Sequence, residues 1–141
     1  MAIDSAVATS RRFRVKDVAA FKADIGTLSN INVVDAVGYD DVPEDSVYIY
    51  SADGFWPEDR TRQYKDQDPV SDDPADVLET VYLPELIAPH LVAGEIAILE
   101  QVSSEDMDVA YAIMMAVNAA GKIVVYDFDS LAKMAIDELS H

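Results

Sequence analysis

One cluster of residues in this chain has the side-chain types that dominate the energy of protein contacts. Trp, Tyr and Arg are the residues most enriched at binding hot spots. The cluster consists of Phe55, Trp56, Arg60, Arg62 and Tyr64, and Trp56 is the only tryptophan. We expect Trp56 or Tyr64 to insert into a partner protein or into a second copy of this chain. The alternative is that Phe55 and Trp56 fasten a loop to the core.

A second group of residues could bind a cation. Ca²⁺ takes six to eight oxygen ligands from carboxylates and carbonyls, and five aspartates lie within eleven residues. These are Asp66, Asp68, Asp72, Asp73 and Asp76. Their spacing lacks the Gly and Glu positions of an EF-hand loop. We interpret the segment as a solvated acidic loop before a capped helix, and we predict no metal site.

No set of residues has the spacing of a catalytic site. His90 is the one internal histidine, and no nucleophile stands at a recognisable spacing from it. Asp129 is expected to cap the last helix, which leaves Asp127 alone. The five glycines are isolated, so no phosphate-binding loop is present. The sequence predicts no enzyme activity and no cofactor.

Negative charge is the dominant property of the chain, with 27 Asp and Glu against 10 Lys and Arg. No Lys or Arg lies between Lys22 and Arg60 or between Lys65 and Lys122. A net charge of −17 opposes compaction, and it disfavours direct binding to nucleic acid, which requires neutralised phosphates. Two acidic turns, 38–45 and 103–108, are the expected charged contacts. Their candidate residues are Asp40, Asp41, Glu44, Asp45, Glu105, Asp106 and Asp108.

Length and composition predict one globular domain. The 141 residues are half hydrophobic and contain no cysteine, which excludes a disulfide framework and a thiolate zinc site. No signal peptide is visible, and no apolar run approaches the roughly 20 residues that span a bilayer. We expect a soluble cytoplasmic protein without membrane contact. The predicted organisation is a flexible N-terminal arm over 1–9 and a single domain over 10–141.

Periodicity predicts the order βαββ-loop-αβββα. The expected strands cover 11–15, 31–37, 47–51, 95–102, 109–117 and 122–128. The expected helices begin at Asp17, cover 75–91 with a kink at Pro84, and begin again at Asp129. Residues 52–74 show no periodicity and are expected to form a long loop. This pattern is typical of an α+β fold with a mostly antiparallel sheet, helices on one face and a loosely ferredoxin-like arrangement.

The strand expected over 109–117 has two different faces. Tyr111, Ile113, Met115 and Val117 share one face, whereas the other face carries small residues. The second face consists of Ala110, Ala112, Met114 and Ala116. Small side chains allow close approach, so we expect a helix to pack on that second face.

These observations favour an acidic protein-binding module that occupies a basic surface on a partner. Such a module could be a DNA-mimic-type inhibitor, or an immunity or anti-defence protein of a phage or plasmid. The alternative is an ordinary cytoplasmic protein of a salt-adapted organism, with an unknown small-ligand or structural role. The excess of Asp over Glu and the scarcity of Lys suit that alternative. Either hypothesis is compatible with a homo-oligomer.

Overall fold

The computed structural model describes residues 5–63, 76–105 and 108–140. The large sheet is antiparallel and has seven strands in the order β2-β4-β1-β7-β8-β9, with β3 on the other edge of β4. A separate hairpin is formed by β5 and β6. The strands of the large sheet are β1 Ser5–Ser10, β2 Phe13–Arg14, β3 Ile31–Val34, β4 Ser46–Ser51, β7 Ile96–Glu105, β8 Asp108–Asn118 and β9 Ile123–Asp127. The remaining elements are β5 Asp59–Gln63, β6 Asp76–Thr80, α1 Val18–Ile25, α2 Leu83–Ile87, a 3₁₀ helix Ala88–His90 and α3 Phe128–Leu139.

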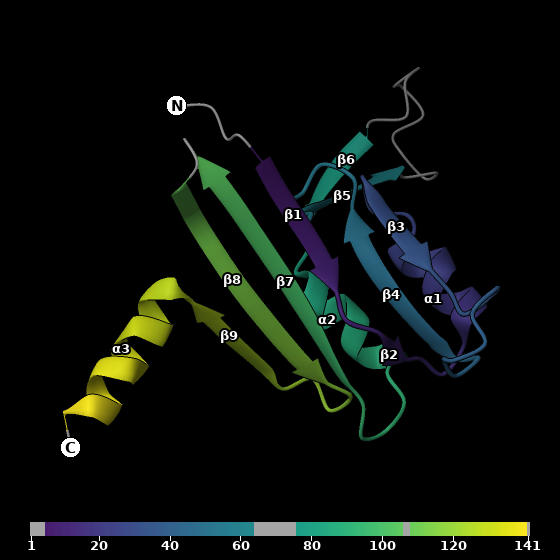
Figure 1. The fold of residues 1–141 in the computed structure, drawn as a ribbon. Coiled ribbons are helices and arrows are strands. Elements are labelled where there is room, and N and C mark those ends of the chain that lie inside the picture. Colours follow the sequence, from purple (N-terminus) through teal and green to yellow (C-terminus); the bar gives the residue numbers. More distant parts are fainter. Residues whose placement is uncertain (1–4, 64–75, 106–107, 141) are drawn as a thin grey trace.

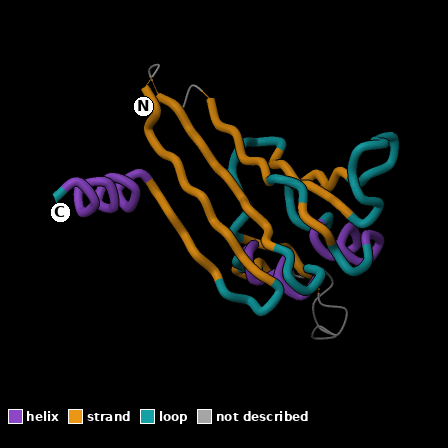
Figure 2. The backbone as a smooth tube through the Cα atoms, turned by 60° about the horizontal axis from the view of Figure 1, so that its bottom comes forward, coloured by secondary structure: helices purple, strands orange, loops and turns teal. Residues whose placement is uncertain are grey.

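The α+β class and the antiparallel sheet are confirmed, but the predicted element order is incomplete. It lacks β1, β5 and β6. The ferredoxin-like arrangement is not confirmed, because the observed order places β1 between β4 and β7. In Figures 1 and 2, α1 and α2 lie on one side of the sheet, whereas α3 extends past β9 instead of covering a face. None of the helices within the described ranges has the length and hydropathy needed to cross a membrane.

The prediction for the N-terminal segment is wrong. Residues 5–9 were expected to belong to a flexible arm, but they form β1, which pairs with β7 over six residues and with β4 at Thr9. Ala8 is buried and faces the helices, while Val7 is exposed on the other face. Small residues such as Ala and Ser have weak strand propensity. The strand therefore depends on pairing with a partner some ninety residues away, which no local pattern reveals.

The predictions for the middle of the chain, residues 52–91, are also wrong in part. The loop expected over 52–74 contains β5, and the helix expected over 75–91 begins with β6, followed by the short helix α2. Pro84 does not kink a long helix; it lies in the first turn of α2, where a missing N–H costs nothing. The hairpin hydrogen bonds of β5 and β6 outweigh the helical periodicity of 75–82.

The helix caps are confirmed at α1 and corrected at α3. Asp17 accepts a hydrogen bond from the Ala20 N–H, as the sequence predicted. At the last helix, the cap is Asp127, whose Oδ1 accepts from the Ser130 N–H at 2.7 Å. Asp129 lies in the first turn instead. The hydrogen bonds from Ser130 lower the pKa of Asp127.

One face of the sheet, which we call the inner face, carries the core. It bears Ile49 of β4, Leu99 of β7 and Val117 of β8, all at most 1% exposed. From α1, Phe21 and Ile25 pack into the same cluster, together with Leu83 and Ile87 of α2. Burial of apolar surface at this interface is the main source of stability.

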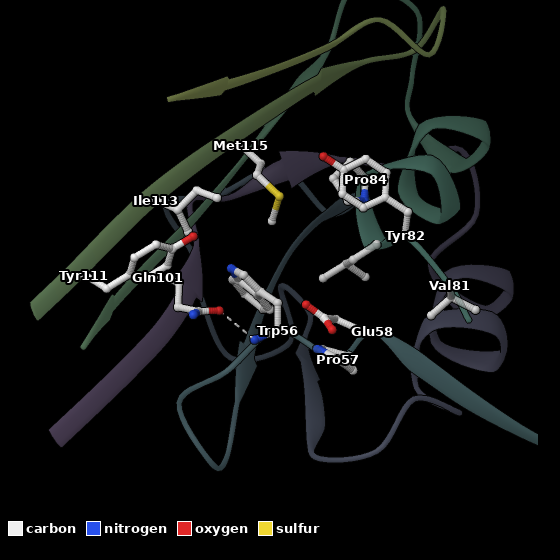
Figure 3. A pocket seen from close by; sticks show the side chains of 11 residues that line it. Trp56, Pro57, Glu58, Val81, Tyr82, Pro84, Gln101, Tyr111, Ile113 and Met115 are labelled. Atoms are coloured by element: carbon white, nitrogen blue, oxygen red, sulfur yellow. Dashed lines mark hydrogen bonds between the residues drawn. The ribbon is translucent and has the colours of Figure 1, made fainter. Parts of the chain in front are cut away.

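No helix within the described residues packs on the face of β8 that carries the small residues. The helices lie on the other side of β8, where Tyr111, Ile113 and Met115 point toward Trp56 and the start of α2 (Figure 3). We expected a helix to cover Ala112, Met114 and Ala116, but within the described part of this chain no helix does so. These residues lie on the opposite face, which we call the outer face.

Gly54 is required by its position beneath β1. Its φ is +84°, and a Cβ there would overlap the carbonyl oxygen and Cβ of Ala6. We expect Gly54→Ala to lower the free energy of unfolding by about 2–4 kcal/mol, from backbone strain and overpacking together. Gly38 has a similar φ of +85° and no atoms near the added Cβ. Gly38→Ala should therefore cost only about 1 kcal/mol in the same urea titrations; equal losses would contradict the close approach to β1.

Candidate functional site

Trp56 is a core residue, not an exposed anchor. Its side chain is 8% exposed and belongs to the hydrophobic core cluster. Its backbone N–H donates to Oε1 of Gln101 on β7 at 2.9 Å, so the loop is tied to the inner face. The neighbouring Phe55 is 38% exposed. The structure thus supports the alternative in which Trp56 fastens the loop to the core.

A turn after β4 positions Trp56. Oδ1 of Asp53 accepts hydrogen bonds from the Ser51 hydroxyl at 2.6 Å and from the Phe55 N–H at 3.1 Å. Its Oδ2 accepts from the Asn30 side-chain amide. The Ser51 hydroxyl, followed by the Phe55 N–H, lowers the pKa of Asp53. An aspartate that bonds the backbone two residues ahead is a typical turn former, and here it directs the chain under the sheet.

A cavity of about 200 Å³ opens beside Trp56, and we call it the Trp56 pocket. Its apolar wall comes from Leu83 and Pro84 at the start of α2 and from Ile113 and Met115 on β8. The polar and aromatic lining consists of Trp56, Glu58, Tyr82, Gln101 and Tyr111. Figure 3 shows the indole nitrogen of Trp56 and the hydroxyl of Tyr111 directed toward the central space, with the Glu58 carboxylate at one side.

The indole Nε1 of Trp56 is the unusual atom of this pocket. It is the one buried side-chain nitrogen or oxygen, within the described residues, that has no hydrogen-bond partner. Leaving a buried donor unsatisfied costs about 1–3 kcal/mol, and buried Trp N–H groups usually find an acceptor. The accessible surface of Nε1 is below 1 Å², so a ligand oxygen supplies that acceptor only when the neighbouring lining side chains shift.

The charges around the Trp56 pocket have one sign. Glu58 is an exposed carboxylate, and its backbone carbonyl accepts from the Val81 N–H at 2.7 Å, which fixes it against the entry to α2. No Lys, Arg or His is found among the described residues that line the cavity. A larger open depression near Lys16 and Asn118 has no comparable unpartnered group. The Trp56 pocket is therefore the better candidate site.

The first acidic turn is partly neutralised within the chain. Oδ2 of Asp45 lies 2.9 Å from the Arg14 guanidinium, whose hydrogen bond lowers the pKa of Asp45. Asp40, Asp41 and Glu44 are exposed, and no ion pair of theirs is found in the part of the chain that the structure describes. Three carboxylates of this turn thus remain available to a cationic partner.

The predicted contact residues do not form one surface. The turn that holds Asp40, Asp41 and Glu44 leads into Ser46, which pairs with Arg14. The turn at Glu105 and Asp108 lies beside Ser5, at the other end of β1 and β7. Asp106 and Tyr64 lie outside the described residues, as does the aspartate cluster from Asp66 to Asp73. The backbones of Arg60 and Arg62 belong to β5, and their side chains are also outside the described set.

His90 has a structural environment. Its Nε2 lies 2.7 Å from Oδ2 of Asp24, and its ring packs edge-on against Phe21 at 5.3 Å between centroids. Through these contacts the 3₁₀ helix is fastened to α1.

Of the lining residues, only Trp56 was predicted as a site residue. The polar and aromatic ones that the sequence did not indicate are Glu58, Tyr82, Gln101 and Tyr111. A signal existed for Gln101, because it follows Ala97 and Leu99 on the core-facing side of β7. A polar side chain at a core-facing strand position is an informative exception. For Tyr82 the helix expected over 75–91 concealed the turn that directs it toward β8.

Comparison with protein families, curated proteins and solved structures found no match for this chain. Function must therefore be inferred from the chemistry of the Trp56 pocket and from the charge of the molecule.

Proposed function

We infer that this chain is a protein-binding module whose Trp56 pocket accepts an Arg or Lys side chain from a basic partner surface. The observation that carries the proposal is the buried, unpartnered Nε1 of Trp56 facing a cavity that also contains the Glu58 carboxylate. Occupation of a basic surface by such a module is how a DNA-mimic-type inhibitor or an immunity protein would act.

The lining of the pocket suits both the apolar stem and the charged end of an Arg or Lys side chain. The methylene stem of Arg or Lys packs on apolar surface while its charged head stays polar, and Met115, Ile113 and Leu83 supply that surface. Glu58 is placed to receive the charge. A carbonyl of the same partner segment can accept from the Trp56 Nε1. Arg has the better fit, because a guanidinium also stacks on aromatic rings such as those of Tyr82 and Tyr111.

The net charge of the whole molecule also favours a basic partner. A body with net charge −17 attracts a basic partner over a distance set by the salt concentration, which raises association rates. The described Arg11, Arg14 and Lys22 are already paired with carboxylates of the chain. They therefore weaken the negative field without creating a basic surface.

The proposal is tested by titrating the protein with acetyl-Gly-Arg-Gly-amide and following Trp56 fluorescence. The sole tryptophan lies in the pocket, so its emission reports occupancy directly. The matched probe contains citrulline, which has the shape of Arg without its charge. We expect the citrulline peptide to bind at least about tenfold more weakly, a difference of roughly 1.4 kcal/mol, and a Glu peptide not to bind. Equal affinity for the Arg and citrulline peptides, or no saturable change with either, would overturn the proposal.

A further inference from the structure

The outer face of β1, β7, β8 and β9 is largely apolar, although nothing described covers it. Its charged exception is Glu100, which lies beside Met114 and pairs with Arg11 at 3.1 Å. Antiparallel sheets with one solvated face normally carry polar residues there. Here Val7 is 59% exposed and Val102 is 42% exposed, and Figure 1 shows β1, β7, β8 and β9 side by side with α2 behind them. The register places Met114 beside Tyr126, and Ala116 beside Val124, on this same face.

The outer face is shaped for a helix. Ala112 and Ala116 flank Met114 on β8, and Ala116 pairs with Ile98 of β7. Small side chains in the middle of a sheet allow a helix to approach closely, and helix on sheet is one of the few stable layer arrangements. Because α1 and α2 lie on the inner face, a helix for this position must come from elsewhere.

Helix α3 has the complementary surface. Phe128, Leu131, Ala135 and Leu139 recur at spacings of three and four residues and form one apolar stripe. Every described residue of the helix beyond Ser130 is exposed, and Leu139 is 85% exposed. A helix of 12 residues is marginal in water without packing. The stripe therefore needs an apolar partner.

The partner surface is not the outer face of the same chain. Helix α3 begins at Phe128, directly after β9 ends at Asp127, so no linker allows it to turn back. The cap fixes this junction, because both the backbone N–H and the hydroxyl of Ser130 donate to Oδ1 of Asp127. Figures 1 and 2 both show α3 extending away from the sheet.

We propose that α3 of each chain packs across the outer face of β7 and β8 in a second copy, forming a twofold dimer by exchange of the last helix. The exposed apolar area of the helix stripe is on the order of 400 Å², taking about 150–250 Å² for a whole large side chain. Each copy buries its own helix stripe and its own sheet face, hence about 800 Å² per copy and about 1,600 Å² in total, which is the standard size of a stable interface. Reciprocal contacts of this kind are isologous and close on themselves.

Salt distinguishes this dimer from the proposed cationic contact. Two copies of charge −17 repel each other, while the helix stripe in the contact is apolar, with Lys133 and Asp137 on the opposite side of α3. Screening of the repulsion therefore strengthens the dimer, whereas it weakens binding of a basic peptide. The dimer can fail while the pocket proposal stands, and the reverse also holds.

Sedimentation equilibrium of the full chain tests the dimer at about 1 M NaCl, where the screening length is about 3 Å. We expect a dimer, and we expect Leu131→Gln with Leu139→Gln to weaken it at least about 100-fold, because two leucines leave the contact. The matched control is Lys133→Gln with Asp137→Gln, which makes the same two replacements on the polar side and keeps the net charge. This control should dimerise like the parent chain.

A cross-link tests which surfaces meet. The chain contains no cysteine, so Ala135→Cys in one preparation and Met114→Cys in another give unique thiols. Mixing the two is expected to produce a disulfide-linked heterodimer far faster than either preparation forms a homodimer. A monomer at all concentrations would overturn the proposal. A dimer that survives the two glutamines on the apolar stripe, or that forms no helix-to-sheet cross-link, would overturn it equally.

Discussion

Replacing Trp56 with alanine is expected to lower the free energy of unfolding by about 3–5 kcal/mol, the usual cost of removing a large aromatic side chain from a core. Trp56 is 8% exposed and lies in the core cluster, so the substitution leaves a cavity beneath the sheet. Urea unfolding followed by circular dichroism measures the loss. Phe55→Ala is the control, because Phe55 is the adjacent aromatic residue and is 38% exposed.

The control substitution should cost no more than about 1 kcal/mol, as expected at a surface position. A small loss at Trp56, equal to that at Phe55, would show that the indole is not a core side chain. It would restore the hypothesis of an exposed aromatic anchor. Trp56→Phe provides a milder variant that fills most of the space but lacks the Nε1–H donor. Its affinity for the Arg peptide should fall while the domain stays folded.

Reversing the charge of Glu58 is expected to weaken binding of the Arg peptide by at least about 100-fold, a free-energy difference of roughly 2.7 kcal/mol. Glu58→Lys both removes the attraction and places a like charge in the pocket. Glu44→Lys is the matched control, since it makes the same change of net charge on the exposed turn before β4. Calorimetric titration of the two variants with the same peptide separates a local contact from the general field.

The Glu44 variant should lose only a few-fold in affinity, and most of that loss should disappear at high salt because surface charges are screened. Equal losses for the two variants would assign binding to diffuse negative charge. A loss confined to Glu44→Lys would move the contact to the acidic turn of Asp40, Asp41 and Glu44.

Local signals predicted some elements of this fold well. The cap at Asp17 and the apolar periodicity that follows it predicted α1, because a cap and an apolar stripe are encoded within one short segment. The strands at the C-terminal end are long, alternate regularly and are joined by short turns. For such hairpins, the information that specifies the pairing lies close together in the sequence.

Elements that depend on distant partners were not predictable in the same way. In β1, Ala6 and Ala8 have little strand propensity, yet both pair with residues of β7 far along the chain. The hairpin of β5 and β6 competes with a helical pattern and prevails through its own hydrogen bonds. Tertiary pairing routinely overrides weak local preferences.

The candidate site was predicted only in part. Trp56 was predicted as a site residue because it is a tryptophan. Its burial, however, follows from the turn at Asp53 and from the hydrogen bond to Gln101. The polar lining comes from three other segments, at Glu58, Tyr82 and Tyr111. Only the folded arrangement brings these segments together, and so composition alone could suggest a cationic partner without locating its contact.

The most direct test of the pocket is the indole N–H signal of Trp56 in a ¹H–¹⁵N correlation spectrum. The chain has one tryptophan, so this signal needs no assignment. On titration with acetyl-Gly-Arg-Gly-amide, we predict a saturable downfield shift of the indole proton as Nε1 gains an acceptor, with no such shift for the Glu peptide. If the peptide binds and shifts backbone signals while the indole signal stays in place, the basic group binds elsewhere and the account of the Trp56 pocket is wrong.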